Sequence, residues 1–242
     1  MNMTGKVVVV TGGGSGVGKS VAKAMAQAGA HVAISGRDRD KLDAVVDELQ
    51  MPNVTPFVCD VTQADQCAGL IADVEKSLGA VDQLINNAGM NVRKRAIREL
   101  SLEDWNALIR TNLDGAFYCL RAVLPGMLAR RNGVIVNIVS VAGKRANPLG
   151  GAGYVAAKFG MGGLGMCLSN EERESGIRVS NIYPGEIDTP ILANRPKPVS
   201  DEQRKLILKP DDVAAAVMFV ATLPVHVSVP ELIIKPTAHA YW

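Results

Sequence analysis

The sequence predicts a single α/β domain built on a doubly wound parallel sheet, on the strength of three observations. The stretch "VVVVTGGGSGVGKS" at 7–20 joins four β-branched residues, a glycine-rich turn and the start of a helix. Short apolar segments alternate with amphipathic helical segments along the chain, which is typical of parallel strands with right-handed crossovers. Finally, 242 residues with 48% hydrophobic content suffice for one substantial core, and no linker interrupts them.

The first half of the chain supplies four predicted strands. Four consecutive valines, Val7 to Val10, are typical of a short strand buried on both faces. The helix that follows from Val17 has its apolar residues on one stripe and is expected to stop at Gly29. Further strands are predicted at 31–35, 54–60 and 81–89, the last with its turn, and helices at 39–50 and 63–78.

The second half continues the alternation. "SLED" at 101–104 resembles a capping box and predicts a long helix to about Arg130, which Pro125 is expected to kink. Further strands are predicted at 133–140, 177–185 and 231–235, and further helices at 153–175 and 210–223. About seven strands result, with helices on both faces. In such sheets ligands bind beyond the carboxyl ends of the strands, where the strand order switches.

Composition excludes several classes of function. The 26 basic and 24 acidic residues nearly balance and form no basic run, so neither a nucleic-acid nor a membrane partner is expected. Four scattered cysteines without a C-x-x-C pair indicate a reducing cytoplasm, and we find no signal peptide or membrane-spanning stretch. The three histidines lie far apart without metal-ligand spacing, so no metal is expected.

The glycine-rich turn fits two kinds of phosphate site. From Gly13 it reads G-x-x-x-x-G-K-S, the P-loop of nucleoside triphosphate enzymes, with Lys19 and Ser20 as phosphate and magnesium ligands. From Gly12 it reads G-x-x-x-G-x-G, a relative of the dinucleotide fingerprint. The P-loop interpretation also needs an acidic residue at the end of another strand, for which Asp60 is the candidate. Both interpretations place a phosphate at the helix N-terminus.

The dinucleotide interpretation makes a second prediction, about 20 residues further on, where a residue should read the adenosine ribose. That place reads "SGRDRD" at 35–40. Gly36 leaves no carboxylate where an NAD enzyme usually has one, and Arg37 suits a 2′-phosphate, which favours NADP. Asp38 could instead turn inward and restore a preference for NAD.

A second motif points to proton transfer. "YVAAK" places Tyr154 and Lys158 four residues apart, on one face of a helix. A lysine cation lowers the pKa of a neighbouring phenol, which would make Tyr154 a proton donor near neutral pH. Ser140 ends the preceding strand at the same sheet edge, where its hydroxyl could hold a substrate oxygen.

Several short motifs occur along the chain in a fixed order, namely Thr11-Gly12-x-x-x-Gly16-x-Gly18, Asn86-Asn87-Ala88-Gly89, Asn112, Ser140, Tyr154-x-x-x-Lys158 and Pro184-Gly185. Together these motifs resemble the short-chain dehydrogenase/reductase family, in its short single-domain branch. The likeness runs from about residue 5 to 235, and order and spacing agree. The family has a Rossmann fold, which the resemblance therefore implies.

The resemblance also implies roles for individual residues. Tyr154 would be the general acid/base, and Lys158 its pKa partner and a donor to the nicotinamide ribose. Ser140 would orient the substrate, and Asn112 would hold a water that relays protons. The implied cofactor contacts are Gly12, Ser15, Gly16, Val17, Gly18, Arg37, Asp60, Val61, Asn87, Ala88, Gly89, Tyr154, Lys158, Pro184, Gly185, Ile187 and Thr189.

Two features depart from the family pattern. Ser140 and Tyr154 are 14 residues apart, one more than usual, and "RANPLGG" between them is expected to absorb the difference in a loop. Ser15 also stands where many NADP-preferring members have a basic residue, so the NADP prediction rests largely on Arg37.

The segment at about 186–209 is the expected substrate lid, because three prolines break its regular structure. Its charges, Arg195 among them, could recognise an acidic substrate or form a solvated face, and the solvated face is favoured. The terminal Tyr241 and Trp242 are expected to pack, for example against another subunit. The resemblance favours a homotetramer.

The sequence as a whole predicts an NADP-dependent oxidoreductase that interconverts a carbonyl and a secondary alcohol on a small-molecule substrate. NAD is the alternative cofactor. A 3-oxoacyl-[acyl-carrier-protein] reductase activity and a non-catalytic NADP-sensing protein are the alternative functions. An ATP-using P-loop enzyme is a third.

Overall fold

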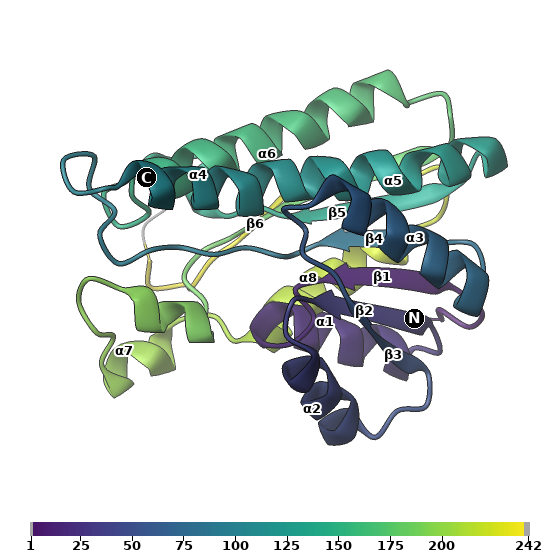
Figure 1. The fold of residues 1–242 in the computed structure, drawn as a ribbon, viewed down its shortest axis with the longest axis horizontal. Helices are drawn as coiled ribbons and strands as arrows, with labels where there is room; N and C mark the ends of the chain where they lie inside the picture. The colour runs from purple at the N-terminus through teal and green to yellow at the C-terminus, as the bar shows by residue number, and fades with distance from the viewer. Residues whose placement is uncertain (1, 240–242) are drawn as a thin grey trace.

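Seven parallel strands form one sheet in the spatial order β3-β2-β1-β4-β5-β6-β7 (Figure 1). The computed structural model describes residues 2–239. The sheet confirms the predicted doubly wound fold, with slightly shorter strands than predicted at several ends. The strands are β1 Val7–Thr11, β2 His31–Gly36, β3 Val54–Val58, β4 Gln83–Asn86, β5 Gly133–Ile138, β6 Ile177–Pro184 and β7 Glu231–Ile234.

Helices cover both faces of the sheet (Figure 1). One core layer lies between the sheet and α1, α2 and α8, and the other lies mainly beneath α3 and α5. Apolar residues alternate between these two layers along β1, since Val8 and Val10 belong to the first and Val7 and Val9 to the second. The helices are α1 Gly16–Gln27, α2 Arg39–Leu49, α3 Ala64–Leu78, α4 Leu102–Ile109, α5 Gly115–Arg130, α6 Ala152–Glu171, α7 Asp201–Leu206 and α8 Pro210–Ala221.

The prediction of one regular helix from 101 to about 130 is wrong in one respect. A π-helical turn, Arg110–Asp114, separates α4 from α5. The side-chain amide of Asn112 donates to the carbonyl of Leu108 at 2.9 Å, the oxygen that an α-helical N–H would otherwise use. Ser101 does cap α4, as its hydroxyl accepts from the Asp104 N–H, and Pro125 lies inside α5.

Three buried asparagines form a ladder across the centre of the sheet. Asn86, Asn137 and Asn181 occupy the same register on β4, β5 and β6. The Asn86 Nδ2 donates to the Asn137 Oδ1 at 3.1 Å, and the Asn137 Nδ2 donates to the Asn181 Oδ1 at 2.9 Å. The Asn181 Nδ2 then donates to the Gly162 carbonyl of α6 at 2.9 Å. The ladder therefore ties α6 to the sheet at a fixed height.

We expect Asn137→Ala to lower the free energy of unfolding by about 2–4 kcal/mol, because it removes one of the two acceptors of the buried Asn86 amide and leaves the buried Asn181 Oδ1 without a partner. Urea denaturation followed by circular dichroism measures the loss. The exposed Asn132→Ala is the control and should change stability by less than about 0.5 kcal/mol. Equal stability of the two variants would show that the ladder has no energetic role.

Candidate active site

A cavity of about 740 Å³ opens at the carboxyl ends of the central strands. Its walls come from the β1–α1 turn, the segment after β4, the segment after β5, the first part of α6 and the chain after β6. The strand order reverses between β1 and β4, so the cavity lies at the switch point where the sequence predicted it.

The glycine turn forms the floor of one end of this cavity. Gly12 and Gly16 have φ angles of +67° and +51°, which favour glycine. A Cβ on Gly12 would lie 2.9 Å from the Cα of Ala88, and a Cβ on Gly18 would lie 2.3 Å from the carbonyl oxygen of Gly12. These glycines thus let the turns after β1 and β4 pack closely, with the N-terminus of α1 at the cavity. A dinucleotide pyrophosphate fits this cradle.

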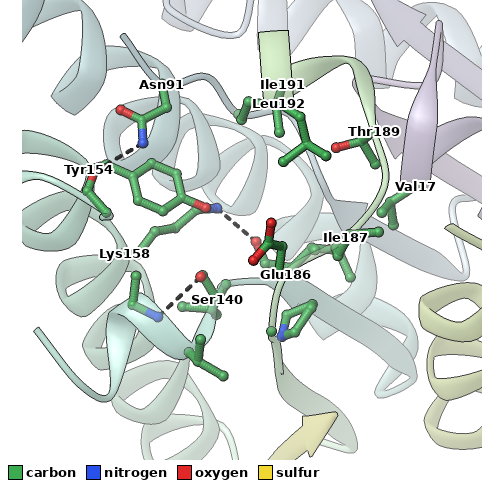
Figure 2. Close-up of a pocket in the computed structure, with 18 of the residues that line it drawn as sticks. Val17, Asn91, Ser140, Tyr154, Lys158, Glu186, Ile187, Thr189, Ile191 and Leu192 are labelled. Atoms are coloured by element: carbon green, nitrogen blue, oxygen red, sulfur yellow. Dashed lines mark hydrogen bonds between the residues drawn. The ribbon is translucent and has the colours of Figure 1, made fainter. Parts of the chain in front are cut away.

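Tyr154, Lys158 and Ser140 line the same cavity (Figure 2). Tyr154 and Lys158 come from the first turns of α6, and Ser140 precedes the short 3₁₀ helix Val141–Gly143. Figure 2 shows Ile187 and Thr189 on the opposite wall, near Val17 of α1. The sheet therefore brings together a phenol, an amine and a hydroxyl that lie far from the glycine turn in sequence.

Lys158 lies beside Tyr154, and its amine hydrogen-bonds to the backbone of β5. Its side chain is 3% exposed, and its Nζ donates to the Ile138 carbonyl at 2.8 Å and lies 5.8 Å from the centre of the Tyr154 ring. Burial lowers the pKa of Lys158 to about 7. Burial raises the pKa of Tyr154, while a hydrogen bond with Ser140 and the charge of Arg95 act to lower it. The groups that favour the phenolate in this structure are therefore Ser140 and Arg95.

Asn112 lies fully buried in the π-helical turn and supports the cavity wall. Its Oδ1 accepts from the Met90 N–H, and its Nδ2 donates to the Met90 carbonyl, both at 3.0 Å. A Cβ on Gly89 would lie 2.9 Å from the same Oδ1. The side chain thus fixes the course of the segment after β4.

Most of the predicted cofactor contacts line the cavity. They are Gly12, Ser15, Gly16, Val17, Asn87, Ala88, Gly89, Tyr154, Lys158, Pro184, Gly185, Ile187 and Thr189.

Four predicted contacts lie outside the cavity lining, namely Gly18, Arg37, Asp60 and Val61. Gly18 packs against Gly12, and Val61 is buried against Gly115. Asp60 follows β3 and accepts from the Thr62 N–H, and Arg37 is exposed after β2.

Asp38, the alternative residue for binding the ribose of NAD, is engaged in other contacts in the structure. Its carboxylate caps α2 by accepting from the Lys41 N–H at 3.2 Å, and it pairs with the Lys41 ammonium at 2.9 Å. These contacts lower the pKa of Asp38. Arg37 has no comparable partner in residues 2–239, so it is the freer of the two neighbouring side chains.

Sequence reasoning missed Arg95. This residue stands in "NVRKRAIREL", where four basic residues give no periodic signal. In the structure it is 6% exposed and lines the cavity beside Tyr154.

The charges of the segment 186–209 mostly pair within that segment. Arg195 pairs with Glu186 at 3.0 Å, and Arg204 and Lys209 both pair with Asp188. Arg204 and Lys209 therefore belong to a surface network. Arg195 and Glu186, whose side chains are 17% and 16% exposed, line the cavity.

Comparison with known proteins identifies the family. The short chain dehydrogenase family model matches residues 6–199. The chain belongs to the short-chain dehydrogenase family. An uncharacterized oxidoreductase of Staphylococcus aureus strain MRSA252 is 33% identical over 234 residues, which cover 97% of this chain and 98% of the relative.

Solved structures of short-chain dehydrogenases and related proteins share the fold over nearly the whole chain. The closed form of a serine dehydrogenase complexed with NADP⁺ has a TM-score of 0.90 at 32% identity, covering 97% of this chain and 96% of its own. An alcohol dehydrogenase of Thermococcus sibiricus complexed with 5-hydroxy-NADP has a TM-score of 0.86 at 30% identity, with 97% and 98% covered. A 3-ketoacyl-(acyl-carrier-protein) reductase of Brucella melitensis complexed with NADH has a TM-score of 0.90 at 26% identity, with 98% and 99% covered.

Membership in the short-chain dehydrogenase family decides between the two interpretations of the glycine turn. Lys19, the phosphate ligand of the P-loop interpretation, pairs instead with Glu48 of α2 at 2.9 Å. Within residues 2–239, no helix is long and apolar enough to cross a membrane, and no group of three His, Cys, Asp or Glu side chains is placed to hold a metal. Tyr241 and Trp242 lie outside the described residues.

The buried Lys158 should make the stability of this short-chain dehydrogenase depend on pH. Its pKa is about 7 in the folded protein against an ordinary 10.5, so between these values the unfolded chain holds more protons and stability rises with pH. Below pH 7 both states hold the proton, and the cost of the buried charge is fully present. From pH 7 to 9, we expect the free energy of unfolding of the wild type to rise relative to that of Lys158→Met by about 1 kcal/mol per pH unit.

Urea denaturation of both proteins at several pH values measures this difference. Lys23→Met, which removes an exposed ammonium from α1, should show no such trend against the wild type. A difference between wild type and Lys158→Met that stays constant with pH would mean that the buried amine keeps its charge.

Proposed function

We propose that this protein is an NADP(H)-dependent oxidoreductase that interconverts a carbonyl and a secondary alcohol, with Tyr154 as the general acid/base. One observation carries the proposal: Tyr154, Ser140 and Lys158 line the same cavity as the glycine turn at the N-terminus of α1. Family membership supports the oxidoreductase class, and the structure adds the arrangement of these side chains.

The mechanism follows from the chemistry of these groups. A bound nicotinamide supplies or accepts the hydride at the substrate carbon. In the reductive direction, Tyr154 donates its phenolic proton to the substrate oxygen, and in the oxidative direction the phenolate takes the proton back. Ser140 is placed to hold the same oxygen, because its hydroxyl already reaches that of Tyr154. Because the pKa of Lys158 is about 7, its amine can hold a proton or donate to a ribose hydroxyl near neutral pH.

We further propose that Arg37 reads the 2′-phosphate of NADP. The capping and ion-pair contacts of Asp38 support this assignment, because they keep the competing carboxylate on α2. The structural relatives complexed with NADP⁺ and 5-hydroxy-NADP are also more similar in sequence than the relative complexed with NADH. Gly18 is proposed to support cofactor binding by letting α1 pack closely against the glycine turn. Asp60 and Val61 are proposed to contact the adenine.

Two alternatives remain within the same fold. A 3-oxoacyl-[acyl-carrier-protein] reductase activity would require a carrier-bound substrate to enter the cavity. The similarity to the Brucella reductase supports this alternative. An NADP-sensing protein would bind the dinucleotide without turnover. A panel of carbonyl compounds assayed after an NADPH-binding measurement separates the three.

The segment 186–209 is proposed as the substrate lid, since it carries cavity-lining residues on the chain after β6. A homotetramer is proposed from the family and from exposed apolar side chains on α4, α5 and α6, namely Leu102, Trp105, Phe117 and Phe159. A cytoplasmic location is proposed because Cys59, Cys67, Cys119 and Cys167 are free thiols.

Tyr154→Phe keeps the ring and removes the proton donor. We expect kcat to fall by about 100-fold or more, because general acid–base catalysis contributes at least that much, while NADPH affinity stays close to that of the wild type. Stopped-flow turnover and fluorescence titration measure the two quantities. Tyr118→Phe on α5, outside the cavity lining, is the matched control. Turnover that survives in Tyr154→Phe would refute the assignment of the acid.

Arg37→Gln tests the cofactor. The preference for NADPH over NADH, measured as a ratio of dissociation constants, should fall by about tenfold, the loss of roughly 1.4 kcal/mol of binding. Arg39→Gln is the control, because Arg39 is held by Asp43 at 2.8 Å on α2. An unchanged preference in Arg37→Gln would place 2′-phosphate recognition elsewhere.

A further inference from the structure

Arg95 is a buried cation without a carboxylate partner. It is 6% exposed, and no Asp or Glu within residues 2–239 lies at ion-pair distance from its guanidinium. Its Nε donates to the Val92 carbonyl and its Nη1 to the Leu149 carbonyl, both at 2.8 Å, and its Nη2 donates to the Asn194 carbonyl. A charged group in this position is costly unless an anion accompanies it.

The guanidinium has donors left for a ligand. Arginine carries five N–H groups, and three of those of Arg95 are used by these backbone carbonyls. Arg95 lines the cavity, and its charge acts on the hydroxyl of Tyr154. The three carbonyls come from three separate segments and fix the plane of the guanidinium, so the group is held in advance of binding.

A second arginine stands close by on the expected lid. The Asn194 carbonyl that accepts from Arg95 directly precedes Arg195, and both arginines line the cavity. Burial and the charge of Arg195 lower the pKa of Arg95. Arg195 is paired with Glu186, and both line the cavity. Glu186 is the one carboxylate among the described residues that line the cavity, whereas five lining residues are lysines or arginines, so positive charge exceeds negative charge there; these basic residues are Arg95, Arg145, Lys158, Arg195 and Lys235.

We propose that Arg95 binds a carboxylate of the substrate, so that the enzyme acts on short oxo acids and the corresponding hydroxy acids. This inference rests on the proposed function, because it places the carboxylate relative to the carbonyl held by Tyr154 and Ser140. Arg195, which Glu186 holds in an ion pair, adds positive charge near the same substrate carboxylate.

The geometry favours a carboxylate over a phosphate. Two spare N–H groups on one planar fork match two carboxylate oxygens, whereas a phosphate dianion would call for further donors. The Arg95 carbonyl accepts from the Ala152 N–H at 3.2 Å, two residues before Tyr154, and both Arg95 and Tyr154 line the cavity. An anion bound to Arg95 therefore lies near the carbonyl that Tyr154 protonates. The substrate chain between carboxylate and carbonyl is accordingly short.

The test uses a matched pair of substrates, 3-oxobutanoate and its methyl ester, which share the reacting carbonyl and differ in charge. The wild type should prefer the acid. In Arg95→Gln, the ratio of kcat/KM for the acid to kcat/KM for the ester should fall by about 100-fold, because a charge-assisted pair is lost. The loss of the Arg95 charge beside Tyr154 acts on both substrates alike and cancels in this ratio. Arg95→Lys keeps the charge without the fork and should give an intermediate preference.

Arg93→Gln is the control, because Arg93 is exposed and lies two residues away. Its substitution removes the same charge from the same segment. It should leave the preference for the acid unchanged. Equal losses for acid and ester in Arg95→Gln, together with a lowered unfolding temperature, would show that Arg95 is only a strap between loops and would overturn the proposal. A wild type that prefers the ester would overturn it as well.

A binding measurement without turnover tests this inference separately from the proposed function. Butanoate and butanamide are titrated by calorimetry into the wild type and Arg95→Gln, with NADPH present. The proposal predicts that butanoate binds the wild type at least about tenfold more tightly than butanamide, and that Arg95→Gln abolishes this preference. Failure of all turnover would refute the proposed oxidoreductase function, and the butanoate comparison would still decide for or against the carboxylate site.

Discussion

The close contact between two turns is the constraint on which the site depends. The turn after β1 and the turn after β4 are joined by the Asn87 side chain, whose Nδ2 donates to the carbonyls of Thr11 at 2.9 Å and Gly12 at 3.2 Å. The Thr11 hydroxyl in turn accepts from the N–H groups of Asn87 and Ala88. This approach is possible only because Gly12 and Gly18 have no Cβ. The packing of the two turns fixes the backbone at the N-terminus of α1, where a pyrophosphate fits.

The opposite wall is positioned by different means. The asparagine ladder holds α6 against β6 through the Gly162 carbonyl, and the Lys158 ammonium holds its first turns against the end of β5 through Ile138. Both contacts are buried hydrogen bonds, which are costly to break. Tyr154 is thus carried on a rigid element, whereas the groups nearest the substrate, Arg95 and Arg195, lie on loops. Rigid placement suits the proton donor, and loops allow specificity to vary within one fold.

The sequence predicted what depends on local pattern and failed where distant segments decide. The alternation of strands and helices and the glycine turn follow from periodicity and from backbone needs within a few residues, so both were found. The π-helical turn at 110–114 depends on Asn112 reaching Met90, 22 residues away. The importance of Arg95 depends on carbonyls 54 and 99 residues further along. No local pattern marks either contact, because both exist only once the sheet has assembled.

The two cations near Tyr154 have different physical characters, and the role of Lys158 as the pKa partner of Tyr154 stays a prediction. A spacing of four places Lys158 on the same helix face as Tyr154, but it does not say where the flexible stem ends, and burial directs the amine to the Ile138 carbonyl. Because its pKa falls to about 7, its charge depends on what else occupies the cavity. The guanidinium of Arg95 keeps its charge at every working pH. In the free enzyme, the permanent field on the phenol therefore comes from Arg95, and the contribution of Lys158 depends on the ligands that surround it.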